Sequence, residues 1–376
     1  MKAGIPKETR DEETRVSATP DIVRELIKLG LQVCVESSAG DRAGYMDEDY
    51  EKAGAEVCGN AAALACDIVL KLNPPSGDEV ARMKKGALLV SFLEPYSGQQ
   101  TAERLAHAGI DALGMESIPR TSRAQSMDAL SSQANIGGYR AVIEAARNLN
   151  RFFPLMMTSA GSAKPAKVAV LGAGVAGLQA IATARRLGAK VEAYDVRAAV
   201  REQIESLGAK FIDVSIEEEG SGSGGYAKEL SEESKKKQQA QLTEKLKGFD
   251  VIITTANIPG RKAPVLVTDE AVKGMRKGSV IVDMAAANGG NCSLTEANRT
   301  VEKFGIVLVG ITNYPALMPA DASNFYGRNL LNLLKLVVKK SQDKVGNVEV
   351  TLDLNLEDDI IAGSLVTHQG QIRTNH

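Results

Sequence analysis

Short apolar runs alternate with amphipathic stretches along the first third of the chain. One amphipathic stretch, after Thr19-Pro20 and through Leu29, is clearly delimited. Threonine suits an N-cap, proline suits the first helical turn, and Gly30 suits the left-handed residue that ends a helix. Strands that alternate with helices of about 10–15 residues are typical of parallel βαβ units. The runs that we expect to form strands are residues 3–6, 31–36, 68–72, 87–92 and 111–115.

Two long helical patterns interrupt this alternation. Residues 126–150 contain few helix breakers apart from Gly137-Gly138, and their apolar positions recur at helical spacing. We expect one long helix that joins two domains and bends near the glycines. Residues 324–339 form the second pattern, which we expect to return the chain to the first domain.

A second βαβ series begins at Lys167, after an expected loop at residues 152–165. The whole pattern predicts an α/β fold of two Rossmann-like domains with parallel sheets, joined by the long helices. We place the N-terminal domain at residues 1–130 plus 325–376 and the second domain at residues 131–324. The further strands expected in the second series are residues 190–195, 250–254, 279–283 and 305–310.

Residues 213–228 of the second domain form an acidic, glycine-rich segment. It contains three consecutive glutamates at 217–219 and only glycine and serine at 220–225. A long loop with few apolar residues is uncommon inside a compact domain, and we expect a mobile lid here. A solvated surface insertion without function is the alternative.

Composition restricts the class of protein. Of the 376 residues, 44% are hydrophobic, which is typical of globular domains, and the length suits two or three domains. The 45 basic and 47 acidic residues nearly balance, so charge gives no reason to expect nucleic-acid binding. The longest notable uncharged run, residues 168–184, is too short and too glycine-rich for a bilayer span, and the start lacks the apolar core of a signal peptide. We therefore expect a soluble, cytosol-type chain.

Cysteine and histidine are scarce. The cysteines show neither metal-type nor disulfide-framework spacing, so we expect them to be small apolar core residues. No histidine lies near another plausible ligand or nucleophile, and we expect neither a metal site nor a Ser-His-Asp triad. The cysteines are Cys34, Cys58, Cys66 and Cys292, and the histidines are His107, His368 and His376.

A glycine motif opens the second domain. Gly172, Gly174 and Gly177 form G-x-G-x-x-G between an apolar strand and an alanine-rich helix. The first glycine permits a tight turn, the second lets the backbone approach a pyrophosphate, and the third allows close packing of helix on strand. The free N–H groups of the helix N-terminus then face the pyrophosphate. This context predicts a dinucleotide site.

Asp195 ends the next expected strand, 18 residues after Gly177. A carboxylate at this position accepts hydrogen bonds from the adenosine 2′-hydroxyl and repels a 2′-phosphate, which favours NAD(H) over NADP(H). Arg197 opposes this preference, because an arginine here can pair with a 2′-phosphate. Since Asp195 ends the strand, we expect NAD(H).

Residues 119–133 form a polar stretch in an otherwise apolar region. On composition alone, this is a polar loop that caps the long helix, with Ser126 or Asp128 near the helix N-terminus. Its cluster of Arg, Gln, Asp and Ser, however, closely resembles the nucleotide-contacting loop of one family. That family is the NAD(H)-binding component of proton-translocating nicotinamide nucleotide transhydrogenase.

The resemblance extends over nearly the whole chain, from Gly4–Glu8 with Arg15-Val16 to Asn288–Cys292. It implies that a tyrosine of the mobile loop closes over NAD(H), which matches Tyr226. The family usually has leucine where this chain has Asn257. The residues that the resemblance implies for holding the nicotinamide end of NADH against NADP⁺ are Arg120, Gln125, Asp128 and Ser131. The cofactor site predicted from motif and resemblance consists of Gly172, Gly174, Val175, Ala176, Gly177, Asp195, Val196, Arg197, Gly225, Tyr226, Ala256 and Asn257.

Alanine dehydrogenase shares much of this pattern and is the main alternative. That enzyme needs a general acid/base beside the nicotinamide. Its substrate arginine is matched by Arg15, but its lysine, histidine and late aspartate fall at Asn73, Glu94 and Ala287. Hydride exchange between two nicotinamides needs only rings held at near-attack distance. A regulatory NAD(H)-binding module without chemistry is a third possibility, and only the polar stretch argues against it.

The resemblance also implies partners. NADP(H) is bound on a separate component, and a membrane-spanning component couples hydride transfer to proton translocation. We further expect a homodimer. The chain is then peripheral, on the cytoplasmic or matrix-type face of a membrane.

Overall fold

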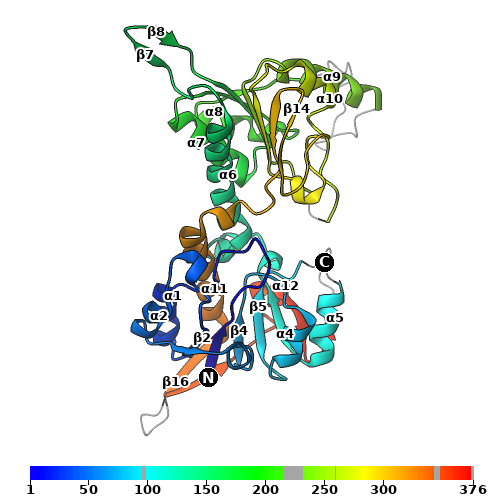
Figure 1. Cartoon of the computed structure of the whole chain (residues 1–376). Coiled ribbons are helices and arrows are strands. Elements are labelled where there is room, and N and C mark those ends of the chain that lie inside the picture. The colour runs from blue at the N-terminus through cyan, green and yellow to red at the C-terminus, as the bar shows by residue number, and fades with distance from the viewer. Residues whose placement is uncertain (95–98, 215–231, 259, 343–347, 374–376) are drawn as a thin grey trace. The chain divides into compact units, whose positions relative to one another are not determined.

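The computed structural model describes residues 1–94, 99–214, 232–258, 260–342 and 348–373. It divides the chain into two compact units (Figure 1). Unit 1 is Met1–Gln133 with Pro315–His376, and unit 2 is Ala134–Tyr314. Each unit contains a mostly parallel sheet with helices on both faces, so the predicted α/β fold of two Rossmann-like domains is confirmed.

Unit 1 is built on an eight-stranded sheet with the order β19-β18-β6-β5-β4-β1-β2-β3. Strands β1 to β6 are parallel, and β18 and β19 pair antiparallel at one edge. The chain order reverses between β1 and β4, which makes this point a topological switch. The strands are β1 Lys2–Ile5, β2 Gln32–Glu36, β3 Glu56–Cys58, β4 Ile68–Leu70, β5 Leu88–Ser91, β6 Asp111–Gly114, β18 Leu365–His368 and β19 Gln371–Ile372, with a separate hairpin of β16 Val338–Gln342 and β17 Val348–Leu352.

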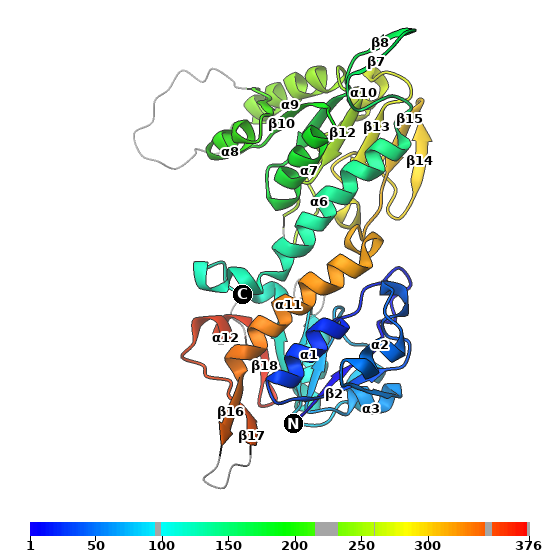
Figure 2. The same ribbon diagram turned by 90° about the vertical axis from the view of Figure 1, so that its left-hand side faces the viewer.

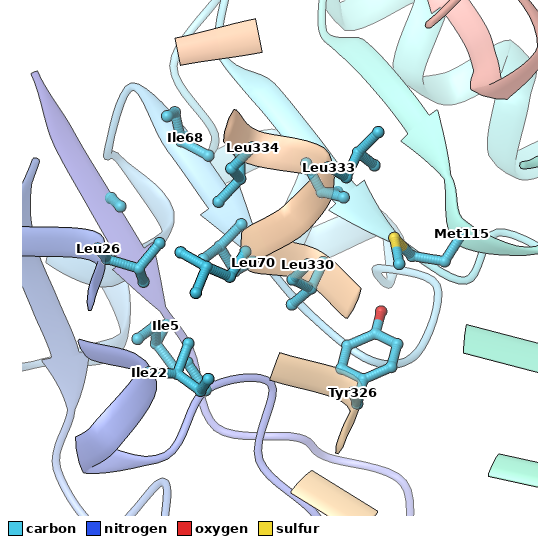
Figure 3. Close-up of a cluster of buried hydrophobic side chains, with 14 of the residues drawn as sticks. Ile5, Ile22, Leu26, Ile68, Leu70, Met115, Tyr326, Leu330, Leu333 and Leu334 are labelled. Carbon is cyan, nitrogen blue, oxygen red and sulfur yellow. The ribbon is translucent and has the colours of Figure 1, made fainter. Parts of the chain in front are cut away.

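Alternate residues of the central strands of unit 1 pack on opposite faces. On β4, Ile68 and Leu70 pack with α1 and α11, as Figure 3 shows, whereas Val69 packs on the side of α3, α4 and α5. Because both faces are covered, these strands are apolar throughout, as the sequence suggested. The helices are α1 Pro20–Lys28, α2 Asp47–Lys52, α3 Asn60–Leu64, α4 Gly77–Arg82, α5 Gln99–Ala108, α11 Pro319–Val337 and α12 Asp359–Ser364, with 3₁₀ turns η1 Asp41–Ala43, η2 Met115–Ser117, η3 Ser122–Met127 and η6 Pro315–Leu317.

The predicted limits of α1 are confirmed, but the predicted cap is only partly right. Thr19 occupies the N-cap position with extended backbone, and Gly30 has φ of +92° after the helix. The Thr19 hydroxyl, however, is buried and makes no hydrogen bond to a described residue. Proline at the first position already lacks the N–H that would need an acceptor, which lessens the need for a side-chain cap.

The prediction that the cysteines are unpaired core residues is wrong for two of them. Cys34 on β2 and Cys58 on β3 form a disulfide, although they are 24 residues apart. The two strands are parallel neighbours with Glu36 opposite Cys58, and the cysteine Cα atoms are therefore only 6.2 Å apart. Such a pairing depends on which strands become neighbours, so sequence spacing does not reveal it. Cys66 and Cys292 are free and buried, as predicted.

Unit 2 is built on a seven-stranded sheet with the order β11-β10-β9-β12-β13-β15-β14. Only β14 runs antiparallel among these strands, and the chain order reverses between β9 and β12. The strand order on each side of β9 is that of a doubly wound dinucleotide-binding fold. The strands are β9 Lys167–Leu171, β10 Lys190–Tyr194, β11 Lys210–Phe211, β12 Val251–Thr254, β13 Val280–Asp283, β14 Thr300–Lys303 and β15 Ile306–Val309.

The helices of unit 2 cover both faces of this sheet. Val168 and Val170 of β9 pack with α6 and α7, and Ala169 and Leu171 pack with α9 and α10 (Figure 2). Within the described ranges, no helix has the length and apolar character needed to cross a bilayer. The helices are α6 Ala129–Asn148, which starts in unit 1, α7 Val175–Arg186, α8 Arg201–Ser206, α9 Glu232–Leu246 and α10 Asp269–Gly274, with η4 Ala198–Val200 and η5 Ala286–Asn288.

The two predicted long helices are confirmed. The glycines of α6 have a packing role, because a Cβ added at Gly138 would lie 2.1 Å from the carbonyl oxygen of Ala176. Glycine therefore lets α6 approach the start of α7 closely. The second long helix, α11, starts a few residues before the predicted position and ends at Val337, where β16 begins.

The segment 152–165 is not a plain loop, as predicted, but contains an antiparallel hairpin. Its strands are β7 Met156–Thr158 and β8 Gly161–Ala163. Most of the residues of these strands are exposed, so no alternation of buried and exposed positions marks them in the sequence.

Candidate dinucleotide site and polar loop

The glycine motif lies at the switch point of unit 2, where β9 ends and α7 begins. Gly172 has φ of +104°, which favours glycine. A Cβ added at Gly177 would lie 1.8 Å from the carbonyl oxygen of Gly172, so only glycine lets α7 pack this closely on the turn. At Gly174, by contrast, an added Cβ would meet nothing within 4 Å. The fold therefore requires two of the three glycines, and the third borders open space.

The N-terminus of α7 faces this open space. The helix starts at Val175 with Gly174 as its N-cap, and no side chain caps it. The N–H groups of the first turn have no acceptor within the helix, and together they carry a partial positive charge. Val175 is 41% exposed, so the turn is accessible. This arrangement suits an anion such as a pyrophosphate.

Asp195 directly follows β10 and is only 8% exposed. Its Oδ1 accepts hydrogen bonds from the N–H of Arg197 at 2.8 Å and from Arg197 Nε at 3.0 Å. Its Oδ2 accepts from the N–H of Ala173 at 2.8 Å and from Arg197 Nη2 at 3.0 Å. Burial raises the pKa of Asp195, but the hydrogen bonds from Arg197 and Ala173 outweigh it and hold the pKa below its usual value. The carboxylate is therefore ionised, and it is paired with the arginine that follows it.

Ala256 and Asn257 follow β12 on the other side of the switch point. Asn291 shapes this segment: its Oδ1 accepts from the Ala256 N–H at 3.1 Å, and its Nδ2 donates to the Ala256 carbonyl at 2.8 Å. Asn257 is exposed, and its Oδ1 accepts from Asn288 Nδ2 at 2.9 Å. Asn291 is fully buried, and sequence reasoning did not single it out although it falls within one of the resembling segments.

The remaining predicted cofactor residues divide into two groups. Val196 is 75% exposed beside Asp195 and at the same edge of the sheet. Gly225 and Tyr226, with most of the predicted lid at 213–228, lie outside the described residues.

The polar loop at residues 119–133 lies in unit 1 and contains η3. Arg120 and Gln125 are exposed, and their side chains make no hydrogen bond within the described ranges. Asp128 caps α6: its Oδ1 accepts from the Ser131 N–H at 2.8 Å and its Oδ2 from the Ser131 hydroxyl at 2.6 Å. Capping by Asp128, the interpretation from composition alone, is therefore correct. It leaves Arg120 and Gln125 without a structural explanation.

Neighbouring helices of unit 1 hold the backbone of this loop. Arg123 donates to both oxygens of Asp358, at 2.6 and 2.9 Å, and also pairs with Asp359. Asn329 of α11 donates to the carbonyl oxygen of Ser126 at 2.9 Å. The loop is therefore attached to two different helices.

A buried clamp holds the first turns of α6 after the loop. Gln133 accepts a hydrogen bond from Arg15 Nη1 at 2.8 Å and donates to the Ala322 carbonyl at 3.1 Å. Arg15 is in turn paired with Glu13 through Nε and Nη2, both at 2.7 Å. Arg15, Glu13 and Gln133 are each less than 10% exposed. With the loop fixed at both ends, Arg120 and Gln125 project from a preorganised backbone.

Arg123→Ala is expected to destabilise the fold in a pH-dependent way. The hydrogen bond from Arg123 lowers the pKa of Asp358 from 3.8 to about 2. A depressed carboxyl pKa stabilises the folded state above the unfolded pKa, and this contribution disappears as the pH falls through the folded pKa. The difference in free energy of unfolding between wild type and variant should be constant from pH 7 to about pH 4, and should shrink between about pH 4 and 2.

The matched control for this denaturation series is Arg104→Ala. Arg104 is an exposed arginine whose Nη2 donates to the neutral side chain of Gln100 at 3.2 Å. Its effect should not vary with pH over the same range. A wild-type to Arg123→Ala difference that is absent at pH 7, or equally large at pH 2, would contradict the role assigned to the pair.

The positions that correspond to alanine dehydrogenase chemistry are occupied by internal partners. All three side-chain nitrogens of Arg15 are bonded to Glu13 or Gln133. Asn73 Nδ2 donates to Glu13 at 3.1 Å, and Glu94 pairs with an arginine, Arg10, at 2.7 Å. Arg15 is therefore engaged inside the protein rather than presented to a substrate carboxylate.

Comparison with known proteins agrees with the fold and the motifs. The models "Alanine dehydrogenase/PNT, N-terminal domain" and "Alanine dehydrogenase/PNT, C-terminal domain" match residues 4–137 and 141–375. A relative from Rhodospirillum rubrum, named as an NAD(P) transhydrogenase subunit alpha, is 48% identical over 99% of this chain and 97% of its own length. The crystal structure of transhydrogenase from Sinorhizobium meliloti is 42% identical, with a TM-score of 0.88 over 99% of this chain and 100% of that one.

Alanine dehydrogenases are more distant. The enzyme of Bacillus subtilis is 29% identical over 86% of this chain and 82% of its own length. The chain therefore belongs to the alanine dehydrogenase/PNT family, in which it is more similar to NAD(P) transhydrogenase alpha subunits than to this alanine dehydrogenase.

Proposed function

We propose that this chain is the NAD(H)-binding component of a proton-translocating transhydrogenase, and that it holds NAD(H) for direct hydride exchange with NADP(H) on a partner component. The observation that carries the proposal is the polar loop. Its backbone is attached to neighbouring helices, while Arg120 and Gln125 are exposed and have no hydrogen-bond partner within the described ranges. The relatives named as transhydrogenase alpha subunits support this reaction class.

The residues at the switch point of unit 2 fit a dinucleotide. The first turn of α7 offers backbone N–H groups to the pyrophosphate, and Gly174 leaves room for its approach. Asp195 is an ionised, buried acceptor for the adenosine ribose hydroxyls. When bound, the nicotinamide supplies the hydride acceptor and donor chemistry. Ala256 and Asn257, across the switch point, are the proposed contacts on the other side of the cofactor.

In this proposal, the polar loop positions the nicotinamide. Arg120 and Gln125 contact the nicotinamide end directly, because their side chains are free to do so. Asp128 and Ser131 contribute as a hydrogen-bonded pair at the start of α6. Hydride exchange between two nicotinamides requires orientation rather than a proton relay. The absence of alanine dehydrogenase's lysine and histidine at Asn73 and Glu94 is consistent with that requirement.

The proposed assembly contains further components. NADP(H) is held on a separate component, and a membrane-spanning component couples the reaction to proton translocation. The chain itself acts as a homodimer at the membrane surface, on the cytoplasmic or matrix-type face. These partners follow from the family and from the relatives' names, which describe a subunit.

A mixing experiment tests the proposal. The purified chain, NADH and NADP⁺ are combined with and without an NADP(H)-binding transhydrogenase component, and NADPH formation is followed. We expect rapid exchange only in the complete mixture. Alanine-dependent reduction of NAD⁺ by the chain alone would instead identify an alanine dehydrogenase. NADH binding without stimulated exchange would identify a regulatory module.

A further inference from the structure

The side chain of Arg197 occupies the place where a ribose would be expected. An ionised carboxylate offers about four lone-pair positions to hydrogen-bond donors. Asp195 already accepts four hydrogen bonds, two from the backbone N–H groups of Ala173 and Arg197 and two from the Arg197 guanidinium. The carboxylate therefore has no free acceptor position for the hydroxyls of an adenosine ribose.

Only one pair of these donors is free to leave. The two backbone N–H groups belong to the turns that follow β9 and β10 and are fixed by the fold. The Arg197 side chain is 59% exposed, whereas that of Asp195 is 6% exposed. Rotation of the Arg197 side chain into solvent would free two acceptor positions on a carboxylate that itself stays in place.

We infer that Arg197 is a specificity-determining residue that competes with the adenosine ribose of NADH for Asp195 and, once displaced, pairs with a 2′-phosphate. This inference rests on the proposed function, since it assumes that a nicotinamide dinucleotide binds at the switch point. In the empty site, the guanidinium compensates the buried negative charge. NADH must break that contact in order to bind.

Two consequences of opposite sign follow. Removal of the guanidinium should strengthen NADH binding, because the ribose no longer displaces a competing donor. The same change should weaken NADPH binding, because the 2′-phosphate loses its cation while the charge of Asp195 remains. A residue that merely contacted the cofactor would weaken both.

Calorimetric titration of the full chain with NADH and with NADPH tests the inference. For Arg197→Ala, we expect NADH to bind about two- to fivefold more tightly, the range typical of exposed ion pairs. We expect NADPH to bind at least about fivefold more weakly, as for a lost charge-assisted hydrogen bond. Arg197→Lys keeps the charge but not the fork that spans both oxygens. It should bind NADH more tightly than wild type and should retain NADPH binding.

Arg201→Ala is the matched control, because Arg201 is an exposed arginine nearby in sequence. It pairs with Asp213 at 2.9 Å and lies 4.3 Å from the centre of the Phe211 ring. Loss of its charge should leave both affinities unchanged. Thermal melting of each variant verifies that the fold is retained.

The outcomes separate the inference from the function. Weaker or unchanged NADH binding by Arg197→Ala, or a wild-type chain that binds NADH but no NADPH at millimolar concentration, overturns the inference and leaves the proposed function intact. A wild-type chain that binds no NADH overturns both.

Discussion

Gly174→Ala is expected to weaken NADH binding by at least about tenfold, a loss of about 1.4 kcal/mol, without changing the thermal stability of the chain. The Cβ that this change adds would meet no atom within 4 Å, and Gly174 does not have positive φ. The protein therefore accommodates it. The proposed pyrophosphate has to approach the same backbone, and a methyl group there would hold it away from the N–H groups of α7.

Gly177→Ala gives the complementary result. Its Cβ would lie 1.8 Å from the carbonyl oxygen of Gly172, so α7 has to move away from the turn. We expect the free energy of unfolding to fall by about 1–3 kcal/mol, as for other overpacked sites, and NADH binding to weaken as well. Calorimetric titration and denaturant unfolding of both variants measure the two effects. Unchanged NADH affinity in Gly174→Ala would show that no cofactor approaches this turn.

Gln125→Asn and Asp128→Ala are expected to lower the rate of hydride transfer by about tenfold to a hundredfold, with less than about threefold change in NADH affinity. Both residues are proposed to orient the nicotinamide, and a displacement of about 1 Å is enough for such a loss. The measurements are single-turnover transfer in the mixed system and NADH titration of the chain alone.

The two variants should differ in stability. Gln125 is exposed and makes no side-chain hydrogen bond within the described ranges, so Gln125→Asn should leave the free energy of unfolding unchanged. Asp128 caps α6, and its loss should cost about 1 kcal/mol. Gln203→Asn, an exposed glutamine on α8, serves as the control for the substitution itself. Loss of NADH affinity in parallel with the rate would show that these residues bind rather than orient.

The sequence predicted those features that depend on local rules. The glycines of the motif, the strand before it and the helix after it follow from backbone geometry, and the structure places them at the predicted switch point. Strands such as β4 and β12, which are buried on both faces, appear in the sequence as continuous apolar runs. Asp128 at the start of α6 was recognisable as a candidate cap because of its residue type and its position.

Features that depend on tertiary neighbours were not predictable in this way. The Cys34–Cys58 disulfide exists because β2 and β3 are adjacent, and the clamp of Arg15 on Gln133 joins residues far apart in the chain. The hairpin of β7 and β8 is largely exposed and has no hydrophobic signature. The pairing of Arg197 with Asp195 is local, but sequence reasoning considered the arginine only as a partner for a phosphate.

The central claim, that this chain presents NAD(H) for direct hydride exchange, is tested most directly by isotope transfer. NADH with deuterium at both C4 positions of the nicotinamide is mixed in ordinary water with the chain, NADP⁺ and an NADP(H)-binding component, and the NADPH formed is analysed by mass spectrometry. Direct transfer predicts one deuterium in each NADPH. NADPH that carries hydrogen from the solvent, or no NADPH in the complete mixture, would contradict it.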